Sequence, residues 1–89
     1  MDIMTRASAG TLESSDAYVE VEPSRGGITL QVESVVEKQF GDQIRQAVTE
    51  VLEQHRVENA LVRVTDRGAL SCVIRARVET AILRGKGEQ

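Results

Sequence analysis

The chain has 89 residues, of which 40% are apolar and 28% charged, a composition typical of one globular domain. Its net charge is −3 and it has only two aromatic residues, Tyr18 and Phe40, so phosphate binding and base stacking are both disfavoured and we expect no nucleic-acid partner. A single cysteine, Cys72, excludes an internal disulfide and favours the cytoplasm, and the lack of a long apolar run argues against a membrane partner or a signal peptide.

Two runs of alternating apolar and polar residues predict the first main strands. They are "AYVEVE" at residues 17–22 and "ITLQVES" at residues 28–34. The intervening "PSRGG" is typical of a turn, so we expect the two strands to form an antiparallel hairpin. A shorter strand is predicted at Gly10–Glu13, and the segment before it, about residues 1–9, is expected to be mobile.

At Ser34 the period of the pattern changes from two to about 3.6, which predicts a helix. "SVVE", Ser34 to Glu37, is typical of a capping box at a helix start. The helix is expected to run to His55 or near it, and Gly41 within it is expected to pack closely against a strand. Its apolar residues recur every three or four positions and form one buried stripe: Val36, Phe40, Ile44, Ala47, Val48, Val51 and Leu52.

A third main strand at residues 60–65 and a second helix complete the pattern. Asp66 is the predicted N-cap of this helix, and Gly85 is predicted to end it, leaving a short tail at residues 85–89. The fold class is therefore α+β, in the order β-β-α-β-α with or without an extra N-terminal strand. We expect residues 1–89 to form a single domain in which two helices pack on one face of a small antiparallel or mixed sheet.

Few side chains are suited to catalysis. His55 is expected to interact with the last carbonyls of its helix, and Cys72 is expected to be a packing residue. One histidine, one cysteine and no suitably spaced carboxylates predict no metal site and no nucleophile–base pair, hence no catalytic residue. Basic residues in the last third form either a solvated face or a surface for an acidic partner: Arg63, Arg67, Arg75, Arg77, Arg84 and Lys86.

The serine pair in "AGTLESSDA" is the remaining candidate. Ser14 and Ser15 lie in a polar segment for which a surface loop is the ordinary interpretation. No neighbouring base activates either hydroxyl, so neither serine is predicted to be a nucleophile. An exposed serine on flexible backbone is instead suited to accept a group that another enzyme attaches.

Three segments, "AGTLESSD", "SVVEKQFGDQIR" and "DRGALSCVIRAR", resemble the acyl carrier protein subunit, the gamma chain, of citrate lyase. They lie at the start, middle and end of the chain. Arg67 and Ser71 depart from that family's pattern, which more often has lysine and aspartate there. The resemblance implies that Ser14, in "GTLES", carries a covalent phosphoribosyl-dephospho-CoA group through a phosphodiester. The adjacent Ser15 is the alternative attachment point.

The resemblance also implies a non-catalytic subunit of a complex that cleaves citrate to acetate and oxaloacetate. The thiol of the group would carry acetyl and citryl thioesters between two partners, the alpha subunit (acyl transferase) and the beta subunit (citryl lyase) of citrate lyase. A prosthetic-group transferase would attach the group, and a host without that enzyme would yield an unmodified chain. The residues alone leave open an α+β protein-docking or regulatory module with an unmodified Ser14. A nucleic-acid binder and an enzyme are less consistent with the composition.

Overall fold

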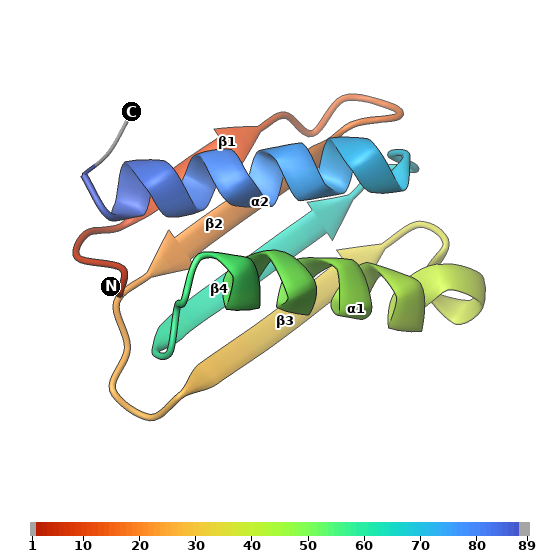
Figure 1. Cartoon of the computed structure of the whole chain (residues 1–89). Coiled ribbons are helices and arrows are strands. Elements are labelled where there is room, and N and C mark those ends of the chain that lie inside the picture. The colour runs from red at the N-terminus through yellow and green to blue at the C-terminus, as the bar shows by residue number, and fades with distance from the viewer. Residues whose placement is uncertain (1, 88–89) are drawn as a thin grey trace.

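The computed structural model describes residues 2–87 and contains four strands and two helices (Figure 1). In chain order they are β1 (Ala7–Gly10), β2 (Ala17–Glu22), β3 (Ile28–Ser34), α1 (Glu37–Gln54), β4 (Ala60–Asp66) and α2 (Ser71–Gly85). The strands form one mixed sheet in the order β1-β2-β4-β3, and both helices cover the same face of it (Figure 1). The α+β class and the one-sided helices are confirmed. The extra strand is also present, but at Ala7–Gly10 instead of Gly10–Glu13.

The predicted hairpin between β2 and β3 is wrong. β2 pairs antiparallel with both β1 and β4, whereas β3 lies at the edge of the sheet and pairs parallel with β4. Helix α1 connects these two parallel strands, as a crossover between parallel strands requires. Alternation along a strand shows which of its faces is buried but not which strand lies beside it. The hairpin of this sheet is β1–β2, and its connecting loop contains Ser14.

The core is built from aliphatic side chains between the sheet and the helices. Residues on the inner faces of the central strands β2 and β4 are almost inaccessible: Ala17, Val19, Val21, Ala60, Val62 and Val64. Helix α1 contributes Ile44, Ala47, Val48, Val51 and Leu52, and α2 contributes Ile74, Val78, Ala81 and Ile82. Most of the stripe predicted for α1 is confirmed. Phe40 of that stripe is instead 44% exposed, and it lines an open groove between the helices together with Leu70, which is 71% exposed.

Neither helix begins with the predicted cap. The N-cap residues are Val36 for α1 and Leu70 for α2, and neither makes a side-chain capping bond. Ser34 and Asp66 are instead the last residues of β3 and β4 and face each other across the parallel pair. Ser34 Oγ donates to Asp66 Oδ2 (2.8 Å), and Asp66 Oδ1 accepts from the amide of Ala69 (2.9 Å). These polar side chains therefore join two strand ends and the segment before α2.

The N-terminal segment, expected to be mobile over about residues 1–9, is packed against the domain from residue 2 onward. Ile3 is 4% exposed and belongs to the core, and Asp2 accepts hydrogen bonds from the amides of Glu58 and Asn59. At the other end, α2 continues through Gly85, and the glycine with positive φ that follows the helix is Gly87. The predicted tail at 85–89 therefore begins later, and residues 88–89 lie outside the described part.

Candidate functional site: the Ser14 loop

Ser14 lies in the loop of residues 11–16 that joins β1 to β2, here named the Ser14 loop. The amide of Asp16 donates to the carbonyl of Glu13 (3.1 Å), which closes a turn with Ser14 and Ser15 at its two central positions. Ser15 has a φ of 67°, an uncommon conformation for a residue other than glycine. Both serines are exposed, and within residues 2–87 no hydrogen bond involves the Ser14 hydroxyl. The turn therefore presents this hydroxyl to solvent.

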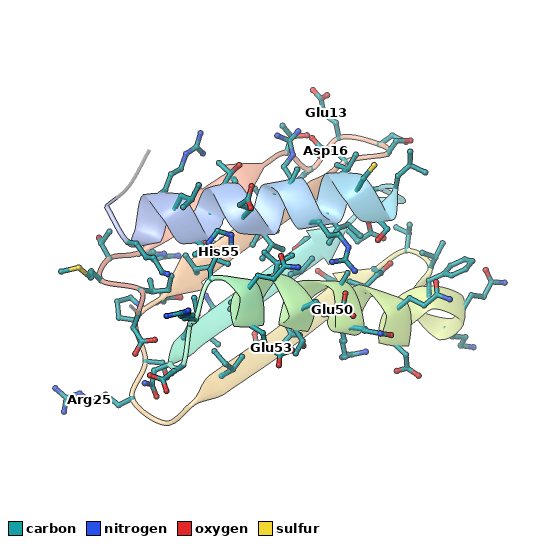
Figure 2. The ribbon with its side chains drawn as sticks, in the orientation of Figure 1. Glu13, Asp16, Arg25, Glu50, Glu53 and His55 are labelled. Carbon is teal, nitrogen blue, oxygen red and sulfur yellow. The ribbon has the colours of Figure 1, made fainter. Side chains whose placement is uncertain are left out.

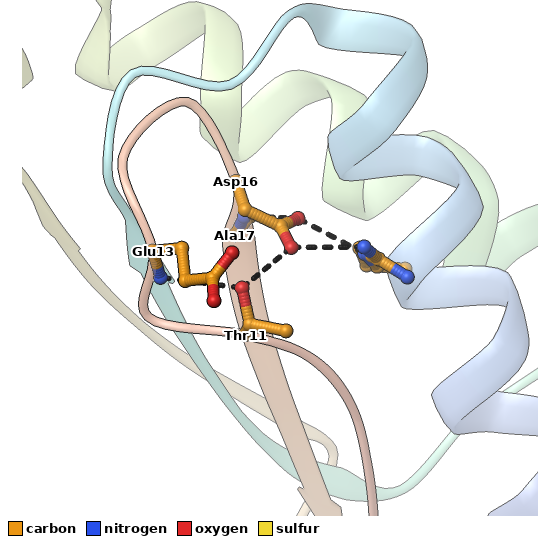
Figure 3. A network of polar contacts seen from close by, with 5 residues as sticks. Thr11, Glu13, Asp16 and Ala17 are labelled. Atoms are coloured by element: carbon orange, nitrogen blue, oxygen red, sulfur yellow. Dashed lines mark hydrogen bonds and ion pairs between the residues drawn. The ribbon is translucent and has the colours of Figure 1, made fainter.

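Asp16 ties the loop to helix α2 (Figure 3). Its Oδ1 accepts from Arg77 Nε (3.0 Å) and its Oδ2 accepts from Arg77 Nη2 (2.9 Å). Thr11 Oγ1 donates to Oδ2 (2.7 Å), and the amide of Ala17 donates to Oδ1 (2.7 Å). All of these bonds favour the charged carboxylate, so the pKa of Asp16 lies well below its usual range, with the Arg77 hydrogen bonds as the largest cause.

The connection between β4 and α2 holds the other side of the turn. The amide of Ser15 donates to the carbonyl of Arg67 (2.8 Å), and the amide of Arg67 donates to the carbonyl of Asp16 (2.9 Å). These two bonds continue the β2–β4 pairing one step beyond Ala17 and Asp66. The sequence predicted a flexible display of Ser14, whereas the structure places it on a turn that is bonded to two other parts of the fold.

Gly10 marks the point where the chain leaves β1 for the loop. Its φ is +96°, and a Cβ added there would lie 1.9 Å from the carbonyl oxygen of Ala17 and 3.1 Å from Arg77 Cδ. Only glycine is compatible with this approach of two backbones. Sequence reasoning missed Gly10, Asp16 and Arg77 as supports of the loop. A glycine directly before a polar loop was an available signal, but the partner of Asp16 is 61 residues away and leaves no local pattern.

The other candidate residues of the sequence lie outside the Ser14 loop. Nε2 of His55 lies 3.0 Å from Glu79 Oε2 of α2, away from Glu13 and Asp16 (Figure 2). The prediction that Cys72 is a packing residue is wrong, because Cys72 is exposed in α2. The basic residues of the last third mostly join elements of this chain: Arg63 pairs with Glu22, Arg75 with Glu50 and Arg77 with Asp16, while Arg84 and Lys86 donate to the carbonyls of Ser8 and His55. Five of these six side chains therefore have hydrogen-bond partners within the chain.

Two classes of feature are missing from the part of the chain that is described. Residues 2–87 contain no cluster of three or more histidine, cysteine, aspartate or glutamate side chains that could hold a metal ion. Neither of the two helices in this range is long and apolar enough to cross a membrane.

The chain is similar over nearly its whole length to known carrier subunits. The family model described as malonate decarboxylase delta subunit matches residues 4–85. A citrate lyase acyl carrier protein of Enterobacter sp. (strain 638) is 51% identical over 89 residues, which cover 100% of this chain and 92% of the relative. The citrate lyase acyl carrier protein of Vibrio cholerae (strain M66-2) is 54% identical over 85 residues, covering 94% and 87%.

The fold has a counterpart among solved structures as well. A chain in the crystal structure of a Pseudomonas malonate decarboxylase hetero-tetramer in complex with malonate superposes with a TM-score of 0.74 at 29% identity. The superposition covers 88% of this chain and 80% of that one. The sequence similarity and the structural similarity thus both extend over nearly the whole chain. This chain belongs to the citrate lyase acyl carrier protein family.

Proposed function

We propose that this chain is the acyl carrier subunit of a citrate lyase and that Ser14 is the attachment point of its prosthetic group. The observation that carries the proposal is the position of Ser14 at the tip of a bonded turn, exposed and with a hydroxyl that makes no hydrogen bond within residues 2–87. Membership of an acyl carrier family supports the carrier role. Ser15 fits less well, because its amide is bonded to Arg67 and its backbone is held at positive φ.

The loop is compatible with a phosphodiester on Ser14. A transferase can reach the hydroxyl without opening the core, since every residue from 11 to 15 is exposed. Asp16, which would repel a phosphate, has both carboxylate oxygens bonded to Arg77. Glu13 is exposed, where solvent and salt screen its charge. When bound, the group would supply a thiol that carries acetyl and citryl units as thioesters, while the chain supplies attachment and display.

We infer that the group is of the phosphoribosyl-dephospho-CoA type and that a dedicated transferase attaches it. The working partners would be the acyl transferase and citryl lyase subunits of citrate lyase. The 51% and 54% identities to citrate lyase carriers favour this assignment over malonate decarboxylase, whose chain is 29% identical. A tether raises the effective concentration of a bound acyl unit at each partner site, so a carrier accelerates the cycle without being a catalytic subunit itself.

The test is the intact mass of the chain purified from its own host while that host makes active citrate lyase. We expect the wild-type chain and Ser15→Ala to carry a mass increment equal to phosphoribosyl-dephospho-CoA, and Ser14→Ala to lack it. An increment that persists in Ser14→Ala but disappears in Ser15→Ala moves the attachment by one residue. An unmodified wild-type chain contradicts the carrier proposal and favours a docking module.

A further inference from the structure

A groove of about 350 Å³ opens between α1 and α2 near the amino ends of both helices. One wall consists of Phe40, Ile44 and Ala47 of α1, and the other consists of Ala69, Leu70 and Ile74 at the start of α2. The volume is within the range of sites that bind small organic molecules, about 300–1,000 Å³. Phe40 and Leu70 expose 44% and 71% of their surface there. The groove therefore presents apolar side chains that nothing in this chain covers among residues 2–87.

The β4–α2 connection links the groove to the Ser14 loop. Arg67, whose backbone bonds to Ser15 and Asp16, is followed directly by Gly68, which lines the groove. Figure 1 shows the β1–β2 loop and the amino ends of both helices at the same end of the molecule. A flexible arm attached to Ser14 thus starts next to the segment that forms one wall of the groove.

The polar side chains that line the groove are of two kinds, those with hydrogen-bond partners among residues 2–87 and those without. Asp66 has both carboxylate oxygens bonded, to Ser34 and to the amide of Ala69, so each oxygen already has a partner within the chain. Gln43 and Ser71 line the same groove and, within the described residues, their side chains make no hydrogen bond. An amide and a hydroxyl are suited to pair with the amide groups of a pantetheine chain, while the apolar walls suit its methyl and methylene groups.

We propose that this groove binds the pantetheine end of the arm carried by Ser14 and shelters its thiol between visits to partner enzymes. The inference rests on the proposed function, because the arm must be attached for the groove to receive it. Attachment at Ser14 makes the binding intramolecular, so weak contacts with Phe40 and Leu70 suffice to populate the bound state. A groove that holds the arm weakly also releases it readily to a partner.

The experiment measures how fast iodoacetamide alkylates the arm thiol, by intact mass, in a Cys72→Ser chain that has no other thiol. If the arm occupies the groove about two-thirds of the time, alkylation is about threefold slower than that of free pantetheine. The double variant Phe40→Ser, Leu70→Ser should restore the rate of free pantetheine. Met4→Ser is the matched control, since Met4 is 70% exposed and does not line the groove. It should leave the protection unchanged.

Protection that is absent in the parent chain, or that persists in the double variant, overturns the proposal. The same holds if Met4→Ser removes protection equally well. If the parent chain shows no protection and the double variant no longer assembles with the catalytic subunits, the groove is a partner surface and not an arm site. Amide NMR spectra of all variants confirm that each retains the fold.

A second preparation separates this inference from the proposed function. This preparation uses the chain with Ser14→Cys and Cys72→Ser. A maleimide derivative of pantetheine is coupled to the new thiol at residue 14. The thiol of the pantetheine is protected during coupling and is freed afterwards. Protection in this preparation supports the groove even if the native chain proves unmodified. If this preparation shows no protection from alkylation while the native chain carries the mass increment at Ser14, the groove proposal is overturned and the proposed function stands.

Discussion

Arg77 of α2 donates two hydrogen bonds to the carboxylate of Asp16, across 61 residues of sequence. The guanidinium and the carboxylate meet as a fork, a geometry that fixes direction as well as distance. Through this pair, the carboxyl-terminal helix determines where the Ser14 loop stands on the sheet. The position of the Ser14 loop is therefore a product of tertiary structure, although Ser14 itself lies in a short local turn.

We expect this pair to make stability depend on pH in the acid range. The pKa of Asp16 is lowered in the folded chain, whereas that of an unfolded aspartate is about 3.9. Its contribution is therefore fully present above the unfolded value and is lost as the pH falls through the folded value. Asp16→Asn should be less stable than wild type at pH 7 and should lose less stability on acidification.

Urea unfolding at a series of pH values from neutral to acid checks this expectation. Asp2 and Glu50 also have lowered pKa values, so the variant should retain part of the acid dependence. Asp42→Asn is the control, because Asp42 is an exposed aspartate of α1. If the unfolding free energies of wild type and Asp16→Asn depend on pH in the same way, Asp16 does not contribute to the acid dependence as expected.

Replacing Gly10 by alanine should disturb the Ser14 loop from its other end. The added Cβ would lie 1.9 Å from the carbonyl oxygen of Ala17, and the φ of +96° is itself unfavourable for alanine. We expect a loss of more than about 1 kcal/mol in the free energy of unfolding. We also expect faster hydrogen exchange at the Ser15 amide, which donates to Arg67. Gly26→Ala is the matched control, since its Cβ would meet nothing within 4 Å, and equal effects at both glycines would refute the explanation.

Asp66 is expected to act as the polar joint between the two parallel strands. It is 1% exposed and accepts hydrogen bonds from Ser34 and from the amide of Ala69. Asp66→Ala leaves both donors without this acceptor and should cost about 3 kcal/mol of unfolding free energy. Asp66→Asn keeps one acceptor oxygen for Ala69 and should cost about 1 kcal/mol. Denaturant titrations measure both, and an equal loss in the two variants would show that hydrogen bonding is not the cause.

Periodicity predicted the individual elements well and their arrangement poorly. The alternation at residues 17–22 and 28–34 gave the bounds of β2 and β3, because burial of one face repeats every two residues. It carried no information about pairing, so the insertion of β4 between them was missed. Local sequence rules predicted Ser34 and Asp66 to cap the two helices. Their side chains instead form a hydrogen bond with each other across β3 and β4. The exposure of Ser14 was predicted correctly, but its support by Arg77 depends on a contact that no local pattern encodes.

Gly85 lies where α2 packs against the N-terminal segment. A Cβ added there would lie 3.0 Å from methyl carbons of both Ile3 and Val21, so overpacking should outweigh the gain in helix propensity and Gly85→Ala should destabilise by about 1 kcal/mol. Ile3→Ala removes one of these neighbours. In that background Gly85→Ala should cost less, with a coupling of about 0.5 kcal/mol or more in a double-mutant cycle by urea unfolding. Strictly additive effects would show that Ile3 does not pack against α2 as described.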